Sequence, residues 1–176
     1  TSVRASGQTS NTTVAAGGSG VKVELYEGAN FNTLRSTRTE ATVYFDDSYD
    51  TRDGGNGDTF SIIVTGQIQA YATGGNTFKI GSDDGVRVWV NGTQVVNSWW
   101  DRGTTYDTFT VPNLTQGNWY DLRIEFYENG GGAALRLLNA NDTVVTTLRQ
   151  QANTSIAGTY GSLDLSSDGS YTYSLN

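Results

Sequence analysis

The chain of 176 residues contains no histidine and no cysteine, so it lacks the usual general base at neutral pH, the usual zinc ligand, any disulfide, and the Ser-His and Cys-His nucleophiles. Its formal net charge of −7 arises from 18 acidic and 11 scattered basic residues, which argues against a nucleic-acid partner because phosphate binding requires a positive surface. No apolar run approaches the roughly 20 residues that span a bilayer, so membrane insertion is not expected.

Residues 1–19 predict a flexible N-terminal segment. They are mostly Ser, Thr, Gly, Ala and Asn, and such side chains cannot bury enough apolar surface to offset the entropy lost on ordering. We therefore expect the folded domain to begin at residue 20.

Residues 20–148 predict one all-β domain. Apolar residues alternate or run together in short segments rich in β-branched and aromatic side chains, and Gly-Gly, Asp-Gly and Asn-Gly turns separate these segments. No stretch shows a sustained helical period. The expected fold class is an antiparallel β-sandwich or barrel with long loops. The predicted strands cover residues 21–26, 42–45, 60–72, 77–81, 86–90, 94–99, 106–111, 119–127, 134–138 and 144–148.

An acidic stretch lies between the second and third predicted strands. It places carboxylates at short intervals around glycines, as irregular calcium loops do, but it lacks the full order of an EF-hand and the closing glutamate of that motif. Two interpretations stay open, a second calcium site and a solvated loop. The candidate ligands are Asp46, Asp47, Asp50, Asp53 and Asp58.

The adjacent carboxylates of Asp83 and Asp84, followed by Gly85, lie between two predicted strands. Asp-Asp-Gly is compatible with an ordinary turn. Alternatively, both carboxylates face one cation. Because neighbouring side chains of an extended chain point to opposite faces, that arrangement requires a local departure of the backbone such as a cis peptide bond.

Residues 149–176 predict a polar connector and a β-hairpin. The hairpin pattern resembles the opening strands of bacterial cadherin-like extender repeats, which occur in giant secreted adhesins. The segment is therefore either a fragment of such an adjoining repeat or the last hairpin of the main domain.

Three motifs carry a further resemblance. They are GVKVELYE at residues 20–27, SDDGVRVWVNG at residues 82–92 and RIEFYENGGGAALRL at residues 123–137. In this order and spacing, the chain resembles the fourteen-kilodalton protective-antigen (PA-fourteen) domain family over residues 20–148. The resemblance implies a β-sandwich. The family's sugar-binding members include yeast flocculins, epithelial adhesins and lectin modules of RTX adhesins, in which a cis-linked aspartate pair and a late loop bind calcium.

The resemblance also implies a ligand set for calcium. Asp83, Asp84 and the side chain of Asn129 match the family's side-chain ligands, and the carbonyls of Gly131 and Ala133 match its main-chain ligands. Calcium takes about six to eight oxygens, so these five leave room for two more. In the lectins that the chain resembles, two neighbouring sugar hydroxyls fill those positions.

Further sugar contacts are expected around this ligand set. Asp83 and Asp84 can accept hydrogen bonds from the coordinated hydroxyls, and Gly130 belongs to the same loop as the carbonyl ligands. In the loop of residues 97–103, we expect Trp99 to face the core and Trp100 to face outward, where it can pack on a sugar. Asp101 and Arg102 can bond sugar hydroxyls.

The sequence thus predicts a calcium-dependent carbohydrate-binding module of a secreted bacterial adhesin, a monomer within a longer chain on the cell surface. The expected ligands are fucose-like or glucose-like sugars with neighbouring hydroxyls. The alternative is a calcium-rigidified spacer or protein-docking domain. A glycosidase is not expected, because its two carboxylates must be about 5 to 9.5 Å apart and not bound to a cation, whereas Asp83 and Asp84 are adjacent.

Overall fold

The computed structural model describes residues 11–15, 17–151, 153–158, 160–166 and 171–175. The chain divides into two compact units. The smaller one is made by the two ends of the chain, Thr1–Gly18 and Gln151–Asn176, and the larger one is Ser19–Gln150. Within the described ranges, no helix is long and apolar enough to cross a membrane.

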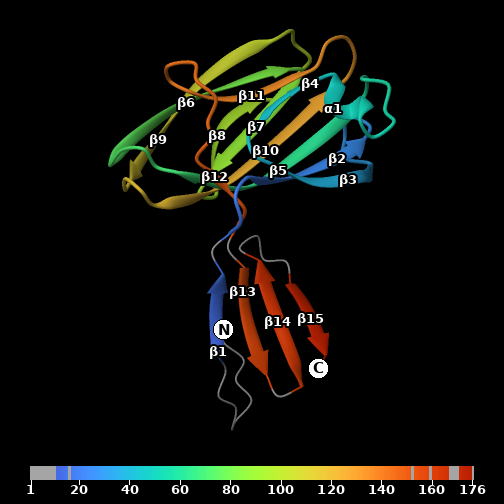
Figure 1. Ribbon diagram of the computed structural model, residues 1–176. Coiled ribbons are helices and arrows are strands. Elements are labelled where there is room, and N and C mark those ends of the chain that lie inside the picture. Colours follow the sequence, from blue (N-terminus) through green and yellow to red (C-terminus); the bar gives the residue numbers. More distant parts are fainter. Residues whose placement is uncertain (1–10, 16, 152, 159, 167–170, 176) are drawn as a thin grey trace. The chain divides into compact units, whose positions relative to one another are not determined.

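The larger unit contains two antiparallel sheets (Figure 1). A seven-stranded sheet has the order β3-β2-β5-β10-β7-β8, with β12 paired to β5, and a four-stranded sheet has the order β4-β11-β6-β9. The two sheets form a sandwich, which confirms the predicted fold class. The elements are β2 (Val21–Glu27), β3 (Thr33–Glu40), β4 (Tyr44–Asp46), α1 (Ser48–Thr51), β5 (Phe60–Gln69), β6 (Gly74–Asp83), β7 (Gly85–Val90), β8 (Thr93–Ser98), β9 (Thr105–Leu114), β10 (Trp119–Glu128), β11 (Ala134–Asn139) and β12 (Leu148–Arg149).

The core lies between the two sheets and follows the alternation of the strands. In β10, Leu122, Ile124 and Phe126 are buried, and in β11 Leu135 and Leu137 are fully buried. All five belong to one hydrophobic cluster to which both sheets contribute. Burial of a side chain of this size stabilises a fold by about 1.5–3 kcal/mol, so the alternating pattern fixes which face of each strand turns inward.

Four connections cross from one sheet to the other at the same end of the sandwich. They are residues 47–59 between β4 and β5, residue 84 between β6 and β7, residues 99–104 between β8 and β9, and residues 129–133 between β10 and β11. The register requires this clustering, because Ala134 pairs with both Asp46 and Asp83, and Glu128 pairs with Phe60. Segments far apart in sequence therefore meet there.

The smaller unit is a four-stranded antiparallel sheet of order β1-β13-β14-β15. Its strands are β1 (Asn11–Ala15), β13 (Asn153–Gly158), β14 (Gly161–Ser166) and β15 (Tyr171–Leu175). Residues 11–15, which composition placed in a flexible segment, thus form a strand paired with β13. Residues 1–10 of that segment, and residues 167–170 of the expected hairpin, lie outside the described residues.

One strand of the larger unit was not predicted, and two predicted strands need correction. Strand β3 was missed because its residues TLRSTRTE lack an apolar alternation, and it lies at one edge of the seven-stranded sheet. The strand expected over residues 144–148 is reduced to a single bridge between Leu138 and Val144 followed by the two-residue β12. The strand expected to reach residue 72 ends at Gln69.

Candidate functional site

The aspartate couplet occupies the crossing between β6 and β7. The peptide bond between Asp83 and Asp84 is cis, the kind of local departure expected if both carboxylates share one side. Asp84 is buried, whereas Asp83 is partly exposed. The Ser82 hydroxyl donates to the Asp84 carbonyl at 2.6 Å, which adds a contact within the crossing.

The Asp84 carboxylate joins two of the other crossings. Its Oδ1 accepts from the backbone N–H of Arg102 at 2.7 Å, and its Oδ2 accepts from the backbone N–H of Asn129 at 2.9 Å. The Oδ2 of Asp83 accepts from the Thr104 hydroxyl at 3.0 Å. The structure therefore brings the couplet together with the loop of residues 99–104 and the glycine-rich loop of residues 129–133.

The Arg102 side chain contacts the segment that carries the couplet. Its Nη2 donates to Asp107 Oδ2 at 2.6 Å and to Ser82 Oγ at 2.7 Å, and its Nε donates to the Asp84 carbonyl at 3.4 Å. Since its ion pair is with Asp107, the guanidinium charge does not neutralise the Asp84 carboxylate directly. Contact between Arg102 and a sugar stays a prediction.

Carboxylates hold the N–H groups of the glycine-rich loop. Gly130 N–H donates to Glu128 Oε1 at 2.7 Å, Gly131 N–H donates to Asp58 Oδ1 at 3.2 Å, and Ala133 N–H donates to Asp47 Oδ1. Gly131 has φ of 108°, a conformation that residues with a Cβ rarely adopt. Glycine is thus required there for the observed path of the loop.

A second small network orients the Asn129 side chain. Asp101 Oδ1 accepts from the Tyr127 hydroxyl at 2.7 Å, and Asp101 Oδ2 accepts from Asn129 Nδ2 at 3.0 Å. Burial, followed by the bond to Asp101, raises the pKa of Tyr127, so the phenol stays a donor. Because Asp101 engages the amide nitrogen of Asn129, the amide oxygen is the atom left for a cation.

Glu128 is a site residue that the sequence reasoning missed. Its side chain is fully buried, and Oε2 has no hydrogen-bond partner among the described residues. Burial, together with the nearby charges of Asp84, Asp83 and Asp47, raises the pKa of Glu128 to about 7. The available signal was the inward alternation of β10 through residues 122, 124 and 126, which continues to position 128.

The chemistry of this end suits calcium. Carboxylate, amide and carbonyl oxygens are the hard ligands that calcium prefers, and the buried Glu128 Oε2 has no hydrogen-bond partner among the described residues. No group of three or more acidic side chains within the described ranges is placed to hold a metal on its own. The expected set has only two carboxylates, Asp83 and Asp84, completed by one amide oxygen and two carbonyls. The residues fit calcium on this basis, and its presence stays a prediction.

The two tryptophans of the neighbouring loop differ in environment. Trp99 stacks on Phe31 with ring centroids 6.1 Å apart and meets Tyr127 edge-on at 4.7 Å, and the Arg87 guanidinium lies 3.8 Å from its ring centroid. Trp100 is 56% exposed. The outward orientation expected for Trp100 is therefore observed, and its ring is available to a ligand. Trp99 is only partly buried and lies outside the hydrophobic core, contrary to the expectation, and it packs against Phe31 and Tyr127 instead.

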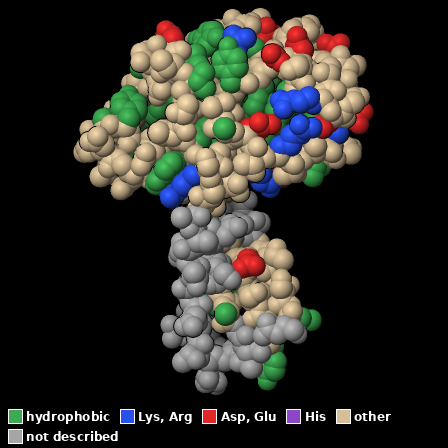
Figure 2. Space-filling view, in the orientation of Figure 1, with side chains coloured by type: hydrophobic (Ala, Val, Ile, Leu, Met, Phe, Trp, Pro, Cys, Tyr) green, Lys and Arg blue, Asp and Glu red, His purple; other side chains and the backbone are tan. Residues whose placement is uncertain are grey.

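The five acidic residues of the second candidate calcium site have different partners in the structure. Asp50 is fully buried, pairs with Arg35 and accepts from Gly57 N–H at 3.0 Å, whereas Asp53 pairs with Arg38. The bond from the Ser36 hydroxyl and the Arg38 pair lower the pKa of Asp53. Asp46 instead accepts from the N–H and hydroxyl of Ser48, and Asp47 and Asp58 face the glycine-rich loop. Figure 2 likewise shows acidic and basic side chains next to one another on one face of the larger unit.

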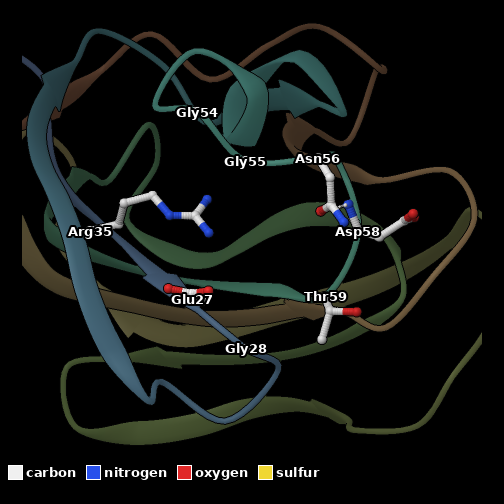
Figure 3. A pocket seen from close by; sticks show the side chains of 8 residues that line it. All are labelled: Glu27, Gly28, Arg35, Gly54, Gly55, Asn56, Asp58 and Thr59. Atoms are coloured by element: carbon white, nitrogen blue, oxygen red, sulfur yellow. Dashed lines mark hydrogen bonds between the residues drawn. The ribbon is translucent and has the colours of Figure 1, made fainter.

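A polar cavity of about 440 Å³ adjoins this acidic stretch (Figure 3). The side chains of Glu27 and Arg35 point into it, and a glycine-rich segment of residues 54–57 closes one side. Thr59, also in its lining, donates its hydroxyl to the Asn129 carbonyl at 3.3 Å. One lining residue is therefore bonded directly to the first residue of the glycine-rich loop. Its lining is Glu27, Gly28, Arg35, Gly54, Gly55, Asn56, Asp58 and Thr59.

The chain is similar to proteins of known sequence and structure. One curated relative is the anti-sigma-I factor RsgI3 of Acetivibrio thermocellus, which is 31% identical over 122 residues. That match covers 69% of this chain but only 19% of the relative. Among solved structures, an anti-sigma factor domain-containing protein superposes with a TM-score of 0.65 at 24% identity, covering 73% of this chain and 46% of the other.

A sugar-binding domain is also among the structural neighbours. The PA14 sugar-binding domain from an RTX adhesin superposes with a TM-score of 0.52 at 15% identity, covering 89% of this chain and 95% of that domain. At these identities the structural matches show a shared fold. Residues 17–154 match the model of the PA14 domain, the family that the three sequence motifs resemble. The chain therefore belongs to the PA14 domain family.

Proposed function

We propose that the larger unit binds carbohydrate through a calcium ion held between the aspartate couplet and the glycine-rich loop. The observation that supports this most is the junction at Asp84, whose carboxylate binds backbone N–H groups of Arg102 and Asn129 at 2.7 and 2.9 Å. Two segments that are 45 residues apart in sequence are thereby joined where the family's sugar-binding members hold calcium.

In this proposal Asp83, Asp84, the Asn129 amide oxygen and the carbonyls of Gly131 and Ala133 hold the ion. Bound calcium supplies positive charge and open coordination positions for two neighbouring hydroxyls of a sugar. The couplet also accepts hydrogen bonds from those hydroxyls, since a carboxylate oxygen has two lone pairs and can accept a second bond beside the one that it already accepts from a backbone N–H or from the Thr104 hydroxyl.

The surrounding residues order the glycine-rich loop in the absence of a sugar. Carboxylates of Asp47, Asp58 and Glu128 hold N–H groups of the glycine-rich loop, so less entropy is lost when its carbonyls engage an ion. The exposed ring of Trp100 offers an apolar face for a sugar ring. One monosaccharide buries few atoms and binds modestly, and several copies on one surface raise avidity.

The test measures sugar binding by calorimetry for fucose-like and glucose-like sugars in calcium and in excess chelator. We expect binding only with calcium, and loss of binding in Asp84→Asn and Asp83→Ala. Asp121→Asn is the matched control, because Asp121 lies in β10 away from the couplet and accepts from Gln67 Nε2 at 2.8 Å. Sugar binding that survives Asp84→Asn with its original affinity would contradict the proposal.

A calcium-rigidified spacer or protein-docking domain is the alternative that the same experiment separates. Such a domain would gain thermal stability from calcium but bind no sugar in either condition. Neither function requires catalysis, and we propose a binding module rather than an enzyme. Incubation with glycans should accordingly release no product.

The role of the longer protein is a separate proposal. A secreted adhesin displayed on a cell surface fits the sugar-binding neighbour from an RTX adhesin. A ligand-binding part of an anti-sigma factor is the second candidate, favoured by the 31% identity to RsgI3 over 122 residues. The coding sequence on either side of this chain separates them, because it encodes either further adhesin repeats or an anti-sigma domain.

A further inference from the structure

A second pocket lies at the other end of the sandwich, away from the four crossings. It is formed by the turn after β5 and the turn after β11, whereas the aspartate couplet and the glycine-rich loop lie where β6 ends and β11 begins. The cavity measures about 380 Å³, within the range of roughly 300–1,000 Å³ common for small-molecule sites. Its lining is Tyr71, Asn139, Ala140, Asn141 and Thr143.

The Tyr71 ring is fixed in place on one side of this pocket. Its backbone N–H donates to the fully buried Asn76 Oδ1 at 2.8 Å, and its hydroxyl accepts from Thr77 N–H at 2.6 Å. The ring meets Phe78 edge-on at 5.6 Å and 76°. Even so, Tyr71 is 49% exposed. A ring held in this way loses little further freedom when a ligand packs on it.

The opposite side of the pocket is a similarly braced turn of residues 139–143. Asn139 N–H donates to the Thr143 carbonyl at 2.7 Å, and Asn139 Nδ2 donates to Thr143 Oγ1 at 3.1 Å. The Thr143 hydroxyl donates in turn to Asn141 Oδ1 at 2.7 Å, and Lys79 holds the turn through Asp142 at 2.7 Å. Among the described contacts, this network leaves Asn139 Oδ1 as an acceptor and Asn141 Nδ2 as a donor.

We propose that this pocket is a second carbohydrate subsite, which takes a neutral pyranose unit without calcium. The lining contains no charged side chain, and the neighbouring Lys79 and Asp142 are paired with each other, so the pocket favours a neutral ligand. It combines an aromatic face with one amide donor and one amide acceptor. A sugar ring presents the matching features, an apolar C–H face and hydroxyls that both donate and accept. The inference goes beyond the calcium site and uses none of its residues.

The experiment is an NMR titration of the whole chain in excess chelator, where the calcium site is inactive. The probes are neutral hexasaccharides of glucose, xylose, mannose and galactose. We expect at least one of them to shift the backbone resonances of Tyr71 and residues 139–143 while those of residues 83–84 and 129–133 stay in place. Tyr71→Ala should weaken that binding at least tenfold, Asn141→Ala severalfold, and Asp84→Asn not at all.

Tyr44→Ala is the matched control, because Tyr44 is 51% exposed on β4 and should be without effect. If Tyr71→Ala fails to fold, saccharide binding by Asn141→Ala tests the proposal in its place. The proposal is overturned if no hexasaccharide binds in chelator at millimolar concentration, or if binding is unchanged in Asn141→Ala. Shifts produced by an unstructured peptide but by no saccharide would also overturn it and would assign the pocket to a protein partner. Failure of calcium-dependent binding leaves this result unaffected.

Discussion

Two acidic regions lie at the same end of the sandwich and differ in how their charge is compensated. In the acidic stretch, Asp50 and Asp53 each pair with an arginine from β3. In the couplet region, the described contacts of Asp83, Asp84 and Glu128 are with N–H and hydroxyl groups, and no Lys or Arg in the described ranges forms an ion pair with them. The protein thus pairs the carboxylates of one region with its own arginines, and the calcium that we propose would compensate those of the other.

The largest loss in free energy of unfolding is expected for a substitution of Asp50. Asp50→Ala would leave the partly buried Arg35 guanidinium, 21% exposed, without its partner, and breaking a buried pair of this kind costs about 3 kcal/mol. The loss in free energy of unfolding should be the same in calcium and in chelator, as measured by urea denaturation. Asp53→Ala, whose partner Arg38 is more exposed, should cost about 1 kcal/mol or less. A calcium-dependent loss in Asp50→Ala would contradict arginine compensation.

Calcium removal should act on the other region. An ion at 100 times its dissociation constant stabilises the folded state by about 2.7 kcal/mol, which corresponds to roughly 5–10 °C in melting temperature for a domain of this size. Scanning calorimetry with calcium and with excess chelator measures the difference. In Asp84→Asn the two scans should coincide, because the ion no longer binds. Identical scans for the unaltered chain would show that no calcium contributes to folding.

Glu128→Gln replaces a buried carboxyl, whose pKa burial raises to about 7, with an amide that carries no charge. We expect the variant to be more stable than the unaltered chain in chelator at neutral pH, by about 1–2 kcal/mol. The advantage should shrink when calcium is added. Glu125→Gln is the control on the same strand, because Glu125 pairs with Arg87 and Arg123 and should gain nothing. Destabilisation of Glu128→Gln in chelator would mean that its carboxylate is already compensated.

The smallest expected effect concerns the two tryptophans. Trp100→Ala should weaken sugar binding by about threefold to tenfold, equivalent to roughly 1 kcal/mol, and leave the melting temperature unchanged. Trp99→Ala should instead lower stability, because it loses the contacts with Phe31 and Tyr127. If Trp100→Ala bound sugar normally, the sugar ring would have to pack elsewhere.

The sequence predicted those parts of the fold that depend on local pattern. Strong alternation identified β2, β7, β10 and β11, and the family motifs identified the couplet and the glycine-rich loop. It did not predict β3 or β1, whose polar residues carry no alternation and whose order depends on pairing with β2 and β13. Non-local pairing of this kind is not encoded in a short window of sequence.

The same reason explains what was missed at the site. The pairing of Asp50 with Arg35 depends on how β3 lies against the connection between β4 and β5. Neither the strand β3 nor its position against this connection was predicted from the sequence. The burial of Glu128 was predictable, because this residue continues the inward face of β10 beyond Phe126. It was not predicted because a charged residue at the end of a strand is usually solvated.

A crystal structure grown with calcium and fucose or glucose would show whether the couplet and the glycine-rich loop hold an ion that binds sugar. We expect one calcium at about 2.3–2.6 Å from oxygens of Asp83, Asp84, Asn129, Gly131 and Ala133, with two neighbouring sugar hydroxyls completing its shell. A couplet without an ion under these conditions, or a sugar bound without contact to the ion, would contradict it.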